Sequence, residues 1–313
     1  MSKRALIYIL VAVGLLYAVR ALEYAGLRRV KNGEFAKLRT VFEEENNFDL
    51  VVIGSSRAEC QFYNPIIDSV TGIHSYNLGM TGATMPLIAA TLEAYLVHSK
   101  APKYVVLNLD LHSLGDNTDT VYKFPRYFAF LGNEKLYDGL QERDGRFFFF
   151  RWLPFYSMPY FTHRYLSNSV SGWLNQPTKF DADYVQGFAP SIVDSVSGDL
   201  DTARMKESHA NIPPAIWEGV NKIQRICKAN QSKLIMVVSP LFYRQQEAVI
   251  GYAAAVTSFS NYADSLGIPF INSGNDSIRY QKQFYADPAH LNREGAVRFT
   301  RSFSPVLIQY LHE

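Results

Sequence analysis

Five short, mostly apolar segments, each followed by a turn and a helical stretch, restrict the fold of this 313-residue sequence more than any other feature. The segments are 50–53, 75–78, 103–109, 233–238 and 269–272. Runs of this kind are typical of strands buried on both faces, and strands that alternate with helices predict a parallel sheet covered on both sides. A last helix is expected from about Asn292, an acceptable N-cap, to Leu311. The pattern predicts an α/β domain over residues 49–313, with three layers and about five parallel strands.

One long segment, 114–211, interrupts this rhythm. An insertion of this length in a compact domain is usually functional or contains helices of its own. Two interpretations fit its aromatic residues: a satellite core, or a surface that lines an acyl or glycan cleft or faces the membrane or a membrane partner. The aromatic residues are Phe147, Phe148, Phe149, Phe150, Trp152, Phe155, Tyr156, Tyr160, Phe161 and Tyr165.

The N-terminus predicts a transmembrane anchor over residues 1–23. An uncharged apolar run begins at Ala5, and if Arg20 snorkels, a helix from Ala5 to Leu22 would be about 27 Å long, close to the roughly 30 Å of a bilayer core. A cleaved signal peptide is the alternative, since 19–21 is a tolerable small-residue cleavage site. Basic residues flank the run on both sides, so charge does not decide its orientation. A charged helical connector is expected over 24–48.

Charge and cysteine content exclude several classes of partner. Thirty-one Lys and Arg against 29 Asp and Glu give a net charge of +2, and no block of like charge suggests a nucleic-acid partner. Cys60 and Cys227 are far apart and have neither metal-ligand nor redox spacing, which favours two buried thiols over a disulfide. No metal or cofactor is expected.

Polar residues follow three of the predicted strands, at the edge of a parallel sheet where ligands bind. Ser56 ends a Gly-Ser-Ser turn at the start of a helix, where free backbone N–H groups favour an oxyanion. Gly82 follows the second strand and would let another N–H approach the same oxygen. A serine becomes nucleophilic only when a base takes its proton, and the D-x-x-H pair Asp287 and His290 can supply that base and orient it.

Each of these motifs is weak alone, but their order along the chain resembles the SGNH (GDSL-like) hydrolase superfamily. The resemblance implies a flavodoxin-like three-layer sandwich, with Ser56 as nucleophile and first oxyanion donor. It also implies Gly82 as the second oxyanion donor, and Asp287 with His290 as the acid/base pair. The Ser56 hydroxyl should therefore lie near one ring nitrogen of His290, with Asp287 on the other, and the N–H groups of Ser56 and Gly82 should point at one spot.

The third motif of the superfamily departs from its usual form. In the stretch 108–113, no asparagine stands at the place after the third strand where the superfamily has its oxyanion asparagine. We take His112 as the substitute donor, and we expect Asn108 to lie within the strand. Arg57, Asn77 and Asp110 are expected to contact substrate, although Asp110 could instead brace Arg57.

The Gly-Ser-Ser-Arg sequence, the membrane helix and the insertion together are similar to an extracytoplasmic branch of this superfamily. Its members include the D-alanine transfer protein and alginate O-acetyltransferases. The resemblance implies a serine-dependent O-acyltransferase or ester hydrolase that acts on a surface polysaccharide, with a membrane-bound O-acyltransferase as partner and the domain outside the cytoplasm. Two alternatives remain: a non-catalytic partner subunit of that acyltransferase, and a lipase-like enzyme with an aromatic lid.

Overall fold

A central sheet of five parallel strands organises the computed structural model, which describes residues 2–110, 121–178, 184–190, 205, 207–209 and 212–311. The strand order is β2-β1-β3-β5-β7, and all four pairings are parallel. This is the flavodoxin-like order. The strand order reverses between β1 and β3, and in folds of this kind ligands bind in the crevice at the carboxyl ends of the two strands. The sequence prediction of the fold class is confirmed. The strands are β1 (Leu50–Ile53), β2 (Ser75–Asn77), β3 (Tyr104–Asn108), β5 (Lys233–Val238) and β7 (Phe270–Asn272).

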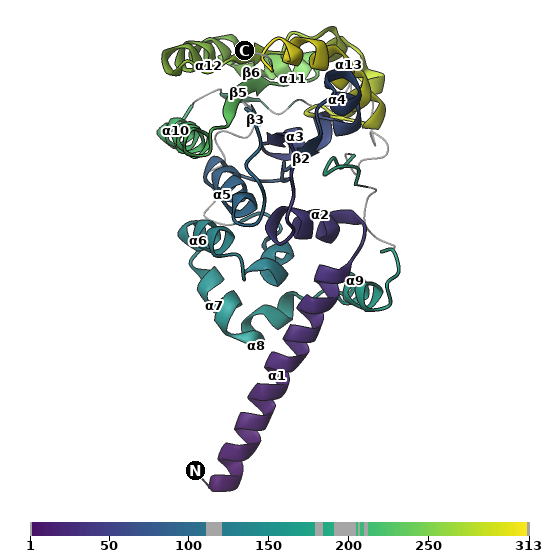
Figure 1. The fold of residues 1–313 in the computed structure, drawn as a ribbon, viewed down its shortest axis with the longest axis vertical. Helices are drawn as coiled ribbons and strands as arrows, with labels where there is room; N and C mark the ends of the chain where they lie inside the picture. The colour runs from purple at the N-terminus through teal and green to yellow at the C-terminus, as the bar shows by residue number, and fades with distance from the viewer. Residues whose placement is uncertain are drawn as a thin grey trace.

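Helices cover both faces of the sheet (Figure 1). Alternate strand residues point to opposite faces, so that Ile53 belongs to one core cluster and Val52 to the other. The first cluster includes α5 (Met85–Leu96), α10 (Pro214–Ala229) and α12 (Tyr252–Leu266). The second includes α3 (Ser56–Gln61), α4 (Asn64–Thr71) and α13 (Arg293–Ile308). Asn292 caps α13 as expected, since its side-chain oxygen accepts from the Gly295 N–H at 2.9 Å.

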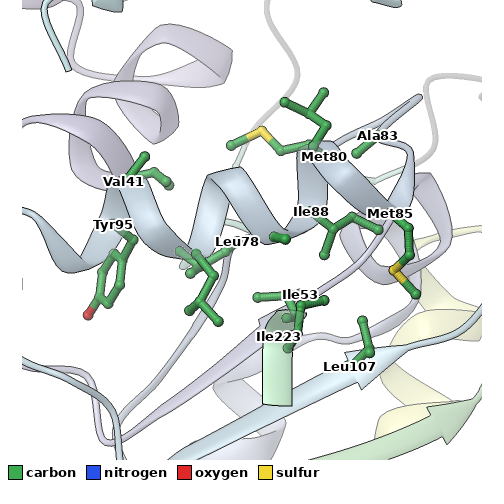
Figure 2. Close-up of a cluster of buried hydrophobic side chains, with 14 of the residues drawn as sticks. Val41, Ile53, Leu78, Met80, Ala83, Met85, Ile88, Tyr95, Leu107 and Ile223 are labelled. Atoms are coloured by element: carbon green, nitrogen blue, oxygen red, sulfur yellow. The ribbon is translucent and has the colours of Figure 1, made fainter. Parts of the chain in front are cut away.

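The first cluster extends beyond the sheet into the segment expected to be a connector. Figure 2 shows Ile53 and Leu107 of the sheet near Ile88 of α5, with Val41 of α2 (Gly33–Phe42) at the end of the same cluster. The large apolar residues of α2 are fully buried: Phe35, Leu38, Val41 and Phe42. The stretch expected to be a connector is therefore part of the domain core, and the core begins well before residue 49.

The described part of the insertion is helical. Phe147 and Phe150 are fully buried and pack with Phe124, Phe128 and Tyr160, as a satellite core would. Other aromatic residues of the same segment remain exposed, among them Phe148, Phe149, Trp152 and Phe155. The satellite-core interpretation therefore holds for the buried residues, and for the exposed ones a cleft-lining or membrane-facing role stays a prediction. Its elements are η1 (Phe124–Phe130), α6 (Glu134–Arg143), α7 (Arg146–Trp152), α8 (Pro154–Ser157), η2 (Met158–Tyr160) and α9 (His163–Trp173).

Smaller elements complete the domain. A hairpin of β8 (Tyr285–Asp287) and β9 (His290–Leu291) precedes α13. Helix α12 begins directly after Gly251, which has a positive φ of 82°. Cys60 and Cys227 are both buried and unbonded, which confirms two thiols. The remaining elements are β4 (Ser208–His209), α11 (Tyr243–Ala248), β6 (Val249–Ile250), η3 (Ser277–Tyr280) and η4 (Lys282–Phe284).

Helix α1 (Lys3–Arg29) is long and apolar enough to cross a membrane. Its 18-residue apolar window has a mean hydropathy of 2.2, and none of that window is buried in the protein. A signal sequence would pass the same test. The last turns of α1 pack on α9 so closely that a Cβ at Gly26 would lie 2.1 Å from the Ser169 hydroxyl, and one at Gly172 would lie 2.0 Å from the Gly26 carbonyl oxygen.

We expect the full chain to remain in membranes after a carbonate wash, because about 18 apolar residues of α1 can span the bilayer. A chain that begins at Arg20 keeps the contacts of α1 with α9 and should be released by the same wash. The measurement is the distribution of both chains between pellet and supernatant. A shortened N-terminus on the mature full-length chain would instead establish a cleaved signal.

Candidate active site

Ser56 is the first residue of α3, directly after β1 and the turn at Gly54 and Ser55. Gly54 adopts a φ of 151°, and a Cβ there would lie 2.7 Å from the Cβ of Ala58, so the turn requires glycine. Ser55 is the N-cap, and its hydroxyl accepts from the Arg57 N–H. Ser56 is only partly buried in an otherwise buried turn. Its hydroxyl therefore remains accessible at the carboxyl edge of the sheet.

The β8–β9 hairpin brings His290 to Ser56 from a position 234 residues away in the sequence. The Ser56 Oγ lies 2.8 Å from His290 Nε2. On the other side of the ring, His290 Nδ1 lies 2.8 Å from Asp287 Oδ2 and 3.0 Å from Oδ1. Nucleophile, base and orienting carboxylate thus form one continuous hydrogen-bonded chain, as the sequence motifs predicted.

Asp287 is held ionised by its surroundings. Partial burial would raise the pKa of Asp287, but the interaction with His290 and the N–H groups of Ala289 and His290 bring that pKa below its usual range. Those backbone N–H groups donate to Asp287 Oδ1 at 2.8 and 3.0 Å. A carboxylate fixed in this way places the proton of the neutral imidazole on Nδ1, which leaves Nε2 free to accept the proton of Ser56.

Two backbone N–H groups near Ser56 could bind an oxyanion. Within the described residues, the N–H of Ser56 and that of Gly82 make no hydrogen bond. Gly82 adopts a φ of 74°, and a Cβ there would overlap the ring of Tyr122. Glycine is therefore required at this position on two grounds. Convergence of the two N–H groups on one spot stays a prediction, and His112 lies outside the described residues.

Arg57 and Asp110 form a buried support for the Ser56 turn. Arg57 is 1% exposed; its Nη1 lies 3.1 Å from Asp110 Oδ1, and its Nη2 donates to the carbonyl oxygens of Ser239 and Pro240. The Ser55 hydroxyl donates to Asp110 Oδ2 at 2.9 Å. The bracing of Arg57 by Asp110 is thus observed, and contact of these two residues with substrate stays a prediction.

Asn77 also has a structural role. It is fully buried, its Nδ2 donates to the carbonyl oxygens of Ala58 and Phe62, and its Oδ1 accepts from the Gly79 N–H at 2.9 Å. Asn108 lies at the end of β3, as expected, and is 1% exposed. These contacts tie α3 to the loop after β2.

A buried ion pair that the sequence analysis did not predict joins α2 to α3 and to the loop after β2. Lys37 Nζ lies 2.8 Å from Glu59 Oε1 and also donates to the Gly79 carbonyl oxygen. Glu59 Oε2 accepts from the N–H of Thr81 at 2.9 Å and from its hydroxyl. Burial would raise the pKa of Glu59, but Lys37 and Thr81 hold it below its usual range. The only sequence signal was a lysine among the apolar residues of α2, which is a weak one.

Arg126 of η1 extends this ionic cluster to the insertion. Its Nη2 donates to the Thr81 carbonyl oxygen at 2.8 Å, and its Nη1 lies 3.2 Å from Glu34 of α2. Thr81 is thus bound through its N–H, hydroxyl and carbonyl groups. The position of Gly82, the next residue, follows from that anchorage.

The chemistry available to the site is that of an activated serine. Among the described residues, no group of three His, Cys, Asp or Glu side chains could hold a metal ion. An ionised Asp287, an oriented His290 and an accessible Ser56 are the elements of nucleophilic attack on a carbonyl carbon.

Comparison with known proteins yields structural similarities alone. No protein-family model matches the sequence, and no curated protein matches it. Similar solved structures include a Streptococcus pneumonia protein assigned as a platelet activating factor, at 12% identity, a TM-score of 0.44 and 100% coverage of both chains. They also include a Bacteroides fragilis protein assigned as an acylhydrolase, at 12% identity and a TM-score of 0.42, covering 88% of this chain and 96% of the other.

A GDSL-like lipase from Bacteroides thetaiotaomicron is a third similar structure. It shows 14% identity and a TM-score of 0.40, and the match covers 83% of this chain and 87% of the lipase. Similarities at this level do not identify an activity. The functional argument therefore depends on the geometry of the site.

Replacing Glu59 with Gln should lower the free energy of unfolding by about 3–5 kcal/mol, because it leaves the Lys37 ammonium buried without its counter-charge. The exposed pair Lys103–Asp49, whose side chains are 70% and 41% exposed, is the matched control, and Lys103→Met should cost no more than about 1 kcal/mol. Urea unfolding of both variants measures the difference. Equal effects would contradict the structural role assigned to the buried pair.

Acid should remove the contribution of Asp287 to stability. Its folded-state pKa lies below the unfolded value near 3.9, so the contribution is present above that pH and is lost as the pH falls through the folded-state pKa. Asp287→Asn should therefore be less stable than the wild type at pH 6, and the gap should narrow in acid. Thermal unfolding against pH measures it, with the exposed Asp264→Asn as control. A gap that widens in acid would contradict the assignment.

Proposed function

We propose that the chain is an SGNH-type enzyme that breaks a carboxylic ester through an acyl-serine intermediate. One observation carries this proposal: the hydrogen-bonded chain Ser56–His290–Asp287 at the carboxyl edge of the sheet. The order of the three residues along the fold is that of the superfamily which the sequence resembles. The acyl acceptor is water in an esterase and a sugar hydroxyl in an O-acyltransferase.

In the first half of the reaction, the Ser56 Oγ attacks the carbonyl carbon of the ester while His290 Nε2 takes its proton. The negative charge of the tetrahedral intermediate develops on the former carbonyl oxygen, where the N–H groups of Ser56 and Gly82 are the candidate donors. When the intermediate collapses, the bond to the alcohol oxygen breaks and the imidazolium returns the proton to that oxygen. Asp287 remains ionised throughout and stabilises the imidazolium.

In the second half, His290 Nε2 takes a proton from the acceptor hydroxyl, whose oxygen attacks the acyl-serine. Collapse of this second intermediate releases the new ester or the free acid and returns the proton to Ser56. The two outcomes differ only in the acceptor. We propose a sugar hydroxyl of a surface polysaccharide, on the basis of the resemblance to the extracytoplasmic acylation proteins.

The position of the site agrees with a substrate outside the bilayer. Along the long axis of the molecule, α3 lies beyond α2 and the insertion helices as seen from α1 (Figure 1). We propose that α1 anchors the chain, that the domain lies outside the cytoplasm, and that a membrane-bound O-acyltransferase is the partner that supplies acyl groups. This arrangement does not favour a lipase that draws its substrate from the lipid acyl region.

A docking subunit without catalytic activity is the alternative to this proposal. The complete triad is the observation against it, because a docking role does not require Ser56, His290 and Asp287 to lie within 2.8 Å of their partners. Covalent labelling distinguishes the two functions directly. A fluorophosphonate should add one adduct to the intact mass of the chain, and the adduct should be absent from Ser56→Ala.

We expect Ser56→Ala to lower the rate of acetate release from a model ester by at least about 10⁴-fold, with little loss of stability. His290→Ala should cost a similar factor, and the double variant little more, because residues that act as a unit are not additive. Asp287→Asn should be milder because it disturbs only the tautomer and orientation of the base. Ser258→Ala, an exposed serine of α12, is the control. Wild-type rates in Ser56→Ala would reject the nucleophile assignment.

A further inference from the structure

The exposed apolar residues of the insertion gather where α1 leaves the domain. Helices α7, α8 and α9 form the end of the domain from which α1 emerges (Figure 1). We define the interface patch as six residues of this end, whose exposed fractions range from 42% to 61%. They are Phe149, Trp152, Phe155, Val170, Trp173 and Leu174. An apolar surface of this extent on a soluble face would be unusual.

Two sets of contacts fix the level of the interface patch on α1. The Tyr17 hydroxyl donates to the Trp152 carbonyl oxygen, and the Trp173 indole N–H donates to the Leu22 carbonyl oxygen at 3.0 Å. Arg20 Nη1 donates to the carbonyl oxygen of Arg151 at 3.1 Å. The patch therefore lies beside the α1 segment between residues 17 and 22.

The length of the apolar run places that segment inside the membrane boundary. At 1.5 Å per residue, a hydrocarbon core of roughly 30 Å takes about 20 residues, so a span that starts at Ala5 ends near Tyr24. Ala5–Val19 alone would cover only about 22 Å. Side chains level with residues 17–22 must therefore lie at the hydrocarbon boundary or just inside it.

The composition of the patch suits this boundary. Tryptophan is enriched at the level of lipid headgroups because its ring is apolar and its N–H is polar. The Arg29 guanidinium lies 3.7 Å from the centre of the Trp173 ring. A positive charge beside an indole ring favours anionic headgroups.

From the level, the exposure and the composition together, we propose that the interface patch inserts into the headgroup and acyl boundary of the bilayer that α1 spans. The domain would then contact the membrane through α1 and through the insertion. The inference rests on the proposed anchoring by α1, but not on the proposed chemistry of Ser56. Close packing at Gly26 and Gly172 keeps the patch and α1 in one rigid unit.

The three tryptophans of the chain allow a direct test. Trp152 and Trp173 belong to the patch, whereas Trp217 of α10 packs against Phe259 and Tyr262 on the sheet-covering helices. Full-length chains that retain one tryptophan each, with the other two changed to Phe, are reconstituted into vesicles of phosphatidylcholine and phosphatidylglycerol. Lipids brominated near the top of the acyl chain serve as short-range quenchers of fluorescence, and resistance to trypsin checks folding.

We expect the brominated lipids to lower the emission of Trp152 and of Trp173 by at least about two-fold, since both rings would lie at the acyl boundary. The Trp217 chain is the matched control and should be unaffected. Unquenched Trp152 and Trp173 in a chain that resists carbonate extraction would overturn the proposal and leave the anchor intact. Shielding of both rings by a second copy of the chain, seen as a concentration-dependent shift without quenching, would also overturn it. Release of the chain by carbonate would remove the anchor and the proposal together, and would leave the Ser56 chemistry untouched.

Discussion

The buried Lys37–Glu59 pair is the interaction on which the arrangement of the site depends. It connects three segments that lie far apart in the sequence: the helix that follows the membrane helix, the helix that begins with Ser56, and the loop that contains Gly82. Burying two charges is costly, and a pair of this kind is stable only when hydrogen bonds satisfy the remaining polar atoms. Thr81 and the Gly79 carbonyl oxygen provide those bonds, and Arg126 adds a link from the insertion.

The candidate active site and helix α1 are therefore parts of one packed structure. Helix α1 packs closely against α9, and α2 lies in the same core cluster as α5. From α2, Lys37 pairs with Glu59, which in turn bonds the loop that contains Gly82. On the opposite side, Arg57 and Asp110 hold the Ser56 turn against the loop after β5. The nucleophile is supported from both directions by buried charged groups, whereas His290 and Asp287 come from a short hairpin that is partly exposed.

Local sequence patterns predicted the sheet, the last helix and the triad because each depends on short-range signals. Apolar runs identified the strands, and the Gly-Ser-Ser and D-x-x-H motifs identified residues that parallel topology brings to one edge. Side-chain pairs between residues distant in the sequence left no such short-range signal. Nothing in the sequence near Lys37 indicated that its partner would be Glu59. The sequence also placed Arg57, Asn77 and Asp110 near the edge of the sheet, but it did not indicate that their side chains bond other parts of the fold.

The crossing of α1 and α9 at Gly26 and Gly172 has a consequence for how the protein reaches its target. With backbone against backbone at that crossing, no flexible tether separates α1 from the domain. If α1 spans the bilayer as proposed, the domain cannot swing through a large volume, and the Ser56 hydroxyl is held at a nearly constant height above the membrane. Tilting and rotation of the whole unit are the motions left to it. Under the proposed chemistry, the substrate must then be long and flexible enough to present its ester at that height.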